Sequence, residues 1–134
     1  MAKKYSLYIS HSWRRENELT RLRNLLENRT YFPIEFLEAS PDRPINSQNA
    51  NYIRQRLGLK ISDSDVLLAI AGVYATTSEW INFEIEVAYQ LGIPIIGVTP
   101  WGQSKISSTV RNYAVDIVGW NTESVVKAIR KYSK

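Results

Sequence analysis

The 134-residue chain carries 17 Lys and Arg against 13 Asp and Glu, a formal net charge of +4. This length fits one domain, so we expect a single domain over residues 1–134. With 44% hydrophobic and 22% charged residues, the composition predicts a globular fold and argues against disorder. The lack of Cys excludes a disulfide scaffold and a thiolate nucleophile, and the single His excludes a multi-His metal centre, so no metal is expected.

The charge and hydropathy patterns argue against nucleic acid and membrane partners. Basic residues occur in scattered pairs such as Arg14-Arg15, without a continuous tract. The longest apolar run, Val66 to Val73, is much shorter than the roughly 20 residues of a membrane span. The opening residues show no signal-peptide pattern, so we expect a cytoplasmic protein.

Short β-rich segments alternate with stretches of helical spacing along the whole chain. In chain order we predict a strand over Tyr5–Ser10, a helix over Arg14–Asn28, a strand over Ile34–Glu38, a helix over Ser47–Gly58, a strand over Val66–Ala71, a helix over Thr77–Leu91, a strand over Ile93–Val98, a helix over Lys105–Tyr113, a strand over Val115–Val118 and a helix over Asn121–Tyr132. Nearly all-apolar strands suit a parallel sheet that is covered on both faces. The alternation therefore predicts an α/β fold, a three-layer doubly wound parallel five-stranded sheet with the flavodoxin-like strand order 2-1-3-4-5.

Cap signals agree with these boundaries. Thr76 and Glu79 have the spacing of a capping box, and Gly92 follows the third helix as a C′ glycine. Asn121 or Thr122 is expected to open the last helix.

The strand order places a crevice at the carboxyl ends of the first and third strands. Several nucleotide-binding classes are excluded there, because no glycine follows the first strand and no P-loop is present. Asp63 and Asp65 precede the third strand, at the wrong edge for a phospho-acceptor site. We expect the crevice to be lined by Ser10, His11, Trp13, Tyr74, Trp80 and Glu84.

Glu84 is the most informative of these residues. At 100° per residue from Trp80, the apolar side chains of its helix span an arc from about −60° to about +140°, and Glu84 falls at about +40°. Burying an ionised carboxylate costs several kcal/mol unless it is paired. A structural bond and a functional role explain the pattern equally well, and the position beside the crevice favours function.

The other polar and aromatic candidates are weaker. His11 has no acid at an orienting spacing, so capping or a polar contact is favoured over acid–base catalysis. Trp101 and Trp120 are expected to pack, whereas Trp13 stands directly at the first crevice loop.

Several of these motifs resemble Toll/interleukin receptor (TIR) domains over nearly the whole chain. The segment Tyr5 to Ser12 is similar to the first TIR box, and Trp80-Ile-Asn-Phe-Glu84 is similar to the W-x-x-x-E element of the third helix. The segments 95–98 and 114–121 look closest to stand-alone bacterial members such as the TIR proteins of Thoeris antiphage systems.

The resemblance implies an enzyme that cleaves the nicotinamide–ribose bond of NAD, with Glu84 as the catalytic residue. NAD would be a substrate, and no cofactor is expected. It also implies a substrate contact at Asp42, although Asp42-Arg43-Pro44 only loosely resembles the R-D-x-x-P-G loop of receptor-type members. Nicotinamide leaves as a neutral molecule, so a lone carboxylate suffices to stabilise an oxocarbenium-like ribose.

Two alternatives stay open. Nucleoside deoxyribosyltransferase-like proteins also break an N-glycosidic bond with a helix glutamate, and Ala88, Gly92 and Pro94 partly match their pattern. In a non-catalytic TIR-type interaction module, Glu84 would be structural and the Asp42 loop would bind partner domains.

The product is expected to be an ADP-ribose-derived or cyclic signalling nucleotide that a separate effector protein reads. Aromatic walls that exclude water would favour attack by a group other than water. Simple NAD depletion needs no reader and remains an alternative. Whether a homo-oligomer completes the site is left open.

Overall fold

The computed structural model describes residues 4–10, 16–29, 32–37, 58–70, 79–99 and 108–133. Its elements are β1 (Tyr5–Ser10), α1 (Glu16–Glu27), β2 (Ile34–Leu37), β3 (Val66–Ile70), α3 (Glu79–Gln90), β4 (Ile95–Thr99), α4 (Ser108–Tyr113), β5 (Asp116–Gly119) and α5 (Thr122–Tyr132). All strand pairs are parallel, and the order is β2-β1-β3-β4-β5. The predicted flavodoxin-like α/β fold is confirmed.

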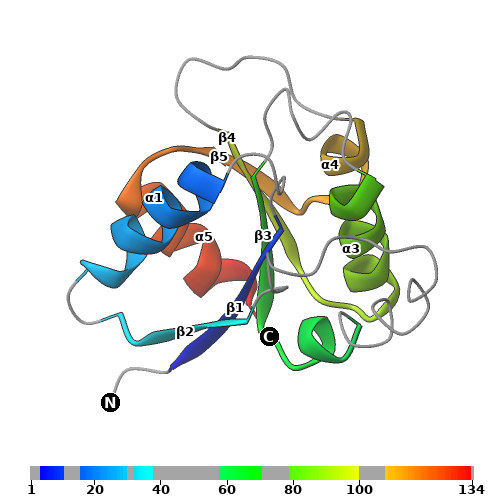
Figure 1. Ribbon diagram of the computed structural model, residues 1–134, viewed down its shortest axis with the longest axis horizontal. Helices are drawn as coiled ribbons and strands as arrows, with labels where there is room; N and C mark the ends of the chain where they lie inside the picture. The colour runs from blue at the N-terminus through cyan, green and yellow to red at the C-terminus, as the bar shows by residue number, and fades with distance from the viewer. Residues whose placement is uncertain are drawn as a thin grey trace.

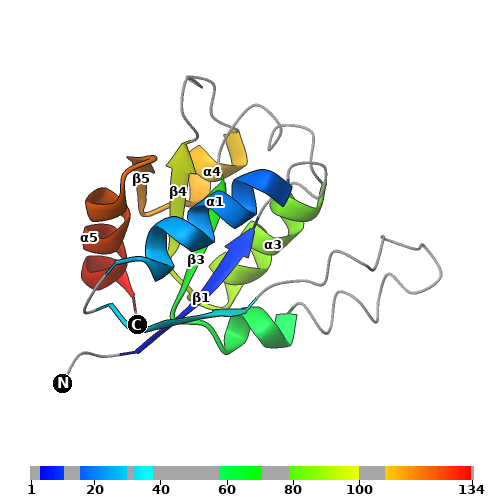
Figure 2. The same cartoon turned by 60° about the vertical axis from the view of Figure 1, so that its left-hand side comes forward.

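Helices cover both faces of the sheet. In Figure 1, α1 and α5 lie on one side of the strands, and α3 and α4 lie on the other. In the turned view of Figure 2, α1 crosses in front of the strands. Within the described part of the chain, no helix has the length and apolar character that crossing a membrane requires.

Each face has its own hydrophobic core because side chains alternate along every strand. The α1/α5 core comprises Leu7, Ile9, Leu22, Leu26, Phe32, Val66, Leu68, Ile70, Ile96, Val98, Val125, Val126, Ala128 and Ile129. The α3/α4 core comprises Tyr8, Ile61, Leu67, Ala69, Ile81, Ile85, Ala88, Ile93, Ile95 and Val110.

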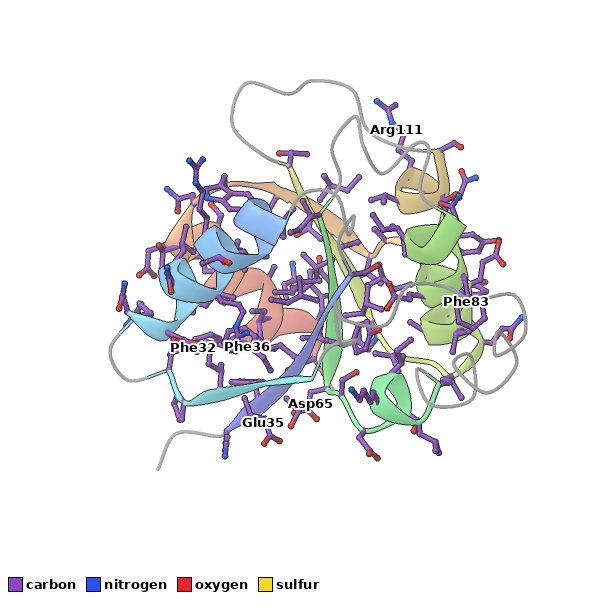
Figure 3. The ribbon with its side chains drawn as sticks, viewed as in Figure 1. Phe32, Glu35, Phe36, Asp65, Phe83 and Arg111 are labelled. Atoms are coloured by element: carbon purple, nitrogen blue, oxygen red, sulfur yellow. The ribbon has the colours of Figure 1, made fainter. Side chains whose placement is uncertain are left out.

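Different charged residues lie at the amino and carboxyl ends of the strands. Figure 3 shows Glu35 and Asp65 near the amino ends of the strands and Arg111 toward the opposite edge. The Asp65 carboxylate accepts a hydrogen bond from the Ser6 backbone N–H at 2.9 Å. Asp65 therefore lies at the amino ends of the strands, where the sequence placed it.

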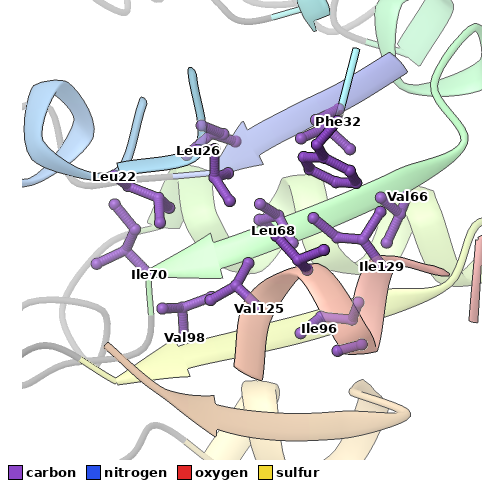
Figure 4. Packing of buried hydrophobic residues seen from close by; sticks show 14 residues of the cluster. Leu22, Leu26, Phe32, Val66, Leu68, Ile70, Ile96, Val98, Val125 and Ile129 are labelled. Carbon is purple, nitrogen blue, oxygen red and sulfur yellow. The ribbon is translucent and has the colours of Figure 1, made fainter. Parts of the chain in front are cut away.

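Packing in the α1/α5 core is wholly apolar. Figure 4 shows Leu22 and Leu26 of α1 and Val125 and Ile129 of α5 directed at the strand residue Leu68 and its neighbours. Trp120 packs against this core, as expected of it. Burial of this kind contributes about 25 cal/mol for each Å² of apolar surface and supplies most of the driving force for folding.

Several predicted boundaries were wrong by a few residues. The second helix was predicted to end at Gly58, but residues 58–62 are helical. Strand β4 begins at Ile95 rather than Ile93, because the Ile93 N–H bonds to the Ala88 carbonyl and still closes α3. Strand β5 runs from Asp116 to Gly119, one residue later than predicted. Leu91 lies past the end of α3 and is exposed, although the helical arc placed it inward.

The caps at two helix ends agree with the sequence. Gly92 has φ +75°, and its N–H bonds to the Tyr89 carbonyl, as expected of a C′ glycine. The Asn121 side chain accepts a hydrogen bond from the Ser124 N–H and so opens α5. Thr76 of the predicted capping box lies outside the described residues.

Candidate functional site

Helix α3 directs one carboxyl group at the sheet. Its inner face carries Ile81, Ile85 and Ala88, all in the α3/α4 core, and Glu84 lies between them. Glu84 is 3% exposed, so its carboxyl group is buried in the protein. Glu86, two residues further along, is exposed. The helical arc that placed Glu84 inward therefore described its orientation correctly.

Two hydroxyl groups from β1 hold this carboxyl group. Tyr8 and Ser10 are two residues apart and therefore point to the same face of the sheet. The Tyr8 hydroxyl donates to Oε2 of Glu84, and Ser10 Oγ donates to Oε1 at 2.9 Å. Both side chains are fully buried. Each carboxylate oxygen thus has its own donor, which fixes the orientation of the group.

Strand β3 lies beside this part of β1. In the β1–β3 register, Leu67 lies beside Tyr8 and Ala69 beside Ser10. Both belong to the α3/α4 core and contribute no polar side-chain atom. Ala69, the register partner of Ser10, carries only a methyl group. The carboxyl group is therefore set in an apolar surrounding, with hydrogen bonds from β1.

Burial changes the acidity of Glu84. Desolvation raises its pKa from 4.5 to about 7, against the lowering effect of the hydrogen bonds from Tyr8 and Ser10. Near neutral pH, the acid and the carboxylate are therefore present in similar amounts. Perturbed carboxyl groups of this kind cluster at functional sites, although structural networks also contain them.

The groups that offset the burial of the Glu84 carboxylate help to judge whether its role is only structural. A buried structural acid usually has a basic partner. Among the described residues, no basic side chain contributes to the pKa shift of Glu84; two neutral hydroxyls do. The described ranges also contain no group of three or more His, Cys, Asp or Glu that could hold a metal ion. The described partners of the Glu84 carboxyl group are therefore neutral hydroxyls.

The structure brings together Ser10 and Glu84 of the predicted crevice residues. The backbone of Trp80 lies in the first turn of α3, but its side chain lies outside what the structure describes. Residues His11, Trp13, Asp42 and Tyr74 lie outside the described ranges, as does Trp101. The assignment of the first four to the site stays a prediction, as does the packing role of Trp101.

Tyr8 is the site residue that the sequence reasoning missed. It forms part of the strand pattern Tyr8-Ile9-Ser10, which was interpreted only as a resemblance. The available signal was the period of two, since Tyr8 and Ser10 share a face while Leu7 and Ile9 take the other. A tyrosine on the face that receives an inward glutamate is a natural donor to it.

Comparison with known families identifies the chain. The sequence profile of the family described as "Thoeris protein ThsB, TIR-like domain" matches residues 8–105, a range that includes Tyr8, Ser10 and Glu84. The chain belongs to this family. The resemblance in its first strand and third helix is thereby confirmed. No curated protein matches the sequence of this TIR-like domain.

Solved structures share the fold of the TIR-like domain at low sequence identity. A CMP N-glycosidase, BcmB, of Clostridium botulinum is 17% identical with a TM-score of 0.53, and the match covers 95% of this chain and 99% of that chain. A 3-dehydroquinate dehydratase-like protein from Bifidobacterium longum is 9% identical with a TM-score of 0.50, covering 97% and 94% of the two chains. These likenesses show a common α/β architecture.

Proposed function

We propose that this TIR-like domain is an N-glycosidase that cleaves the nicotinamide–ribose bond of NAD with Glu84 as its catalytic carboxylate. The observation that carries the proposal is the buried Glu84, held by two hydroxyls of β1. Membership in the Thoeris TIR-like family supports it. The fold shared with the CMP N-glycosidase BcmB agrees with the reaction class.

Cleavage of the nicotinamide–ribose bond needs a carboxylate but no general acid. The bond between C1′ of the ribose and the pyridinium nitrogen breaks, its electron pair leaves with the base, and nicotinamide departs neutral. The positive charge then lies on an oxocarbenium-like ribose, which ionised Glu84 stabilises by its charge or by transient attack on C1′. Water or another nucleophile completes the reaction at C1′ and gives up a proton. A low-dielectric surrounding strengthens the attraction between the two charges.

The substrate would approach Glu84 from the carboxyl end of β1. Ser10 is the last residue of this strand and already contacts the carboxylate, so its hydroxyl is the first candidate to meet a ribose hydroxyl. We assign the remaining substrate contacts to His11, Trp13, Asp42, Tyr74 and Trp80. Aromatic residues among them would stack on the base or shield the cation from water.

We further propose that the product is an ADP-ribose-derived or cyclic nucleotide that signals to a separate effector protein in antiphage defence. Membership in the Thoeris TIR-like family supports this proposal. An enzyme of this kind would work in the cytoplasm, where NAD is available. Self-association would be one way to complete the site.

A second candidate is an N-glycosidase that acts on a nucleoside or nucleotide. The specific observation in its favour is the shared fold with the CMP N-glycosidase. Cytosine leaves less readily than nicotinamide because it departs from a neutral ring and needs a proton. The protonated fraction of Glu84 near neutral pH could supply one.

One assay separates these functions. The purified protein is incubated with NAD, CMP or deoxynucleosides, and free base is measured by chromatography across a range of protein concentrations. Nicotinamide supports the first proposal, and cytosine or another nucleobase supports the second. Release that disappears in Glu84→Gln but persists in Glu86→Gln assigns the reaction to this site. No base from any substrate would overturn both proposals in favour of an interaction module.

A further inference from the structure

We propose that Tyr8 is a positioning residue of this site, whose hydroxyl fixes one carboxylate oxygen of Glu84 and favours the ionised form of that group. The inference rests on the proposed function, in which Glu84 reacts as a carboxylate. It assigns to Tyr8 a role through Glu84 and no contact with substrate.

The geometry separates Tyr8 from Ser10. Both donate to Glu84, but Ser10 is the last residue of β1, whereas Tyr8 lies two residues further from the carboxyl edge of the sheet. Tyr8 is fully buried in the α3/α4 core, with Leu67 beside it in the β3 register. A substrate that arrives at the carboxyl edge therefore meets the Ser10 side of the carboxylate, and Tyr8 stays behind it.

This division gives the two hydroxyls different tasks. If Ser10 turns its hydroxyl toward a substrate, Oε1 of Glu84 becomes free to face the developing charge. The bond from Tyr8 to Oε2 would persist and keep the carboxyl plane in place. Tyrosine suits this role because the Tyr8 ring is fully buried in the α3/α4 core and has few rotatable bonds.

The same bond acts on the charge of Glu84. A hydroxyl that donates a hydrogen bond to a carboxylate favours the ionised form. Glu84 accepts one such bond at each of its two oxygens. Burial pushes in the opposite direction and brings the pKa to about 7. Without Tyr8, burial would be opposed by Ser10 alone, and less of Glu84 would be ionised at neutral pH.

Few other groups in the described residues could exert this control. Strands β3 and β4 carry no titratable side chain. On the helices packed around the site, the titratable groups whose side chains are described are Lys60 of the 58–62 segment, Glu86 and Tyr89 of α3, and Arg111 and Tyr113 of α4. None of them contributes to the pKa shift of Glu84, whereas Tyr8 does.

The first test is the pH profile of nicotinamide release by Tyr8→Phe, which removes the hydroxyl and keeps the ring. We expect the rising limb of the profile to move up by about one pH unit, the value of one hydrogen bond to a charged group. Activity should fall about fivefold at pH 7 from this shift and recover toward pH 9. Tyr113→Phe is the matched control, because Tyr113 packs against the same core without a bond to Glu84 among the described contacts. An unshifted limb in Tyr8→Phe would overturn the proposal.

The second test needs no substrate and therefore separates this inference from the proposed function. In protein labelled with ¹³C at the Glu carboxyl carbons, the Glu84 signal is assigned by its loss in Glu84→Gln and titrated by NMR. Its midpoint should lie higher in Tyr8→Phe than in the wild type and be unchanged in Tyr113→Phe. If this holds while NAD is not cleaved, the substrate assignment fails and the role of Tyr8 stands. Equal midpoints would overturn the role of Tyr8.

A wild-type measurement covers the case in which Tyr8→Phe does not fold. With ¹³C at the Tyr Cζ carbons, the Tyr8 signal should follow the titration of Glu84 with the same midpoint, because its acceptor changes from a carboxylate to an acid. This response should vanish in Glu84→Gln. A Tyr8 signal that ignores the Glu84 titration would contradict the proposal.

Discussion

The two faces of the central sheet are built from the same strands but carry different kinds of side chain. Strand β1 sends Leu7 and Ile9 into the α1/α5 core, and it sends Tyr8 and Ser10 toward α3. All four side chains are essentially fully buried. The faces therefore differ in polarity and not in exposure. A face that could have been closed with apolar side chains instead keeps a carboxyl group and two hydroxyls.

This difference indicates where function lies. The α1/α5 core does what burial requires, and its residues need only to be apolar and to fit. On the other face, Glu84 lowers stability at neutral pH because its carboxylate is desolvated. Destabilising features that packing alone does not require are characteristic of active sites.

The largest expected effect comes from Glu84→Gln. Base release should fall at least about 1,000-fold, because the variant keeps the shape and loses the charge. The protein should fold and, at pH 8, be more stable than the wild type, since a desolvated charge is removed. Urea unfolding and the base-release assay measure the two effects, with the exposed Glu86→Gln as control. An unfolded Glu84→Gln protein would make Glu84 a structural residue.

Leu67→Ala and Leu68→Ala compare the two faces directly. The residues are adjacent and fully buried, one in each core. Each truncation should cost about 2 to 5 kcal/mol of unfolding free energy by leaving a cavity. Only Leu67→Ala should also reduce the rate of base release per folded molecule, because Leu67 lies beside Tyr8 in the β1–β3 register. Equal activity losses, measured at temperatures where both variants are folded, would count against a functional difference between the faces.

The pH dependence of stability should also reveal the site. Because the pKa of Glu84 is raised in the folded state, from 4.5 to about 7, the folded protein binds the proton more tightly. The contribution of Glu84 to the free energy of unfolding is complete below pH 4.5 and is lost as the pH rises through 7. The loss should be about 3 kcal/mol. Urea unfolding from pH 4.5 to 8 would measure this loss as the difference between the wild type and Glu84→Gln. Parallel curves for the two proteins would refute it.

A helix cap on the apolar face should have the smallest effect. Asn121→Ala removes the side chain that accepts the Ser124 N–H at the start of α5. The loss should be about 1 kcal/mol of unfolding free energy, with base release unchanged. Thermal unfolding checks the first value and the base-release assay the second. Reduced activity of the folded variant would show that the α1/α5 face also supports the site.

Much of this architecture could be predicted from the sequence. The alternation of apolar strands with amphipathic helices predicted the parallel order, because buried parallel strands leave few polar positions. The inward position of Glu84 followed from the 100° helical period, which depends only on local spacing. Helix and strand ends were less accurate, as at Ile93, because they depend on which backbone groups find partners.

What the sequence determined by itself was therefore local: the elements, their faces and the presence of one carboxyl group on an apolar face. Only the tertiary structure decided what that carboxyl group meets. Tyr8 and Glu84 are 76 residues apart, and they come together because β1 lies beside β3 and α3 packs across both. The raised pKa of Glu84 could not be predicted from the sequence either. Desolvation and hydrogen bonding depend on all the groups around a buried atom, and these are not its neighbours in the chain.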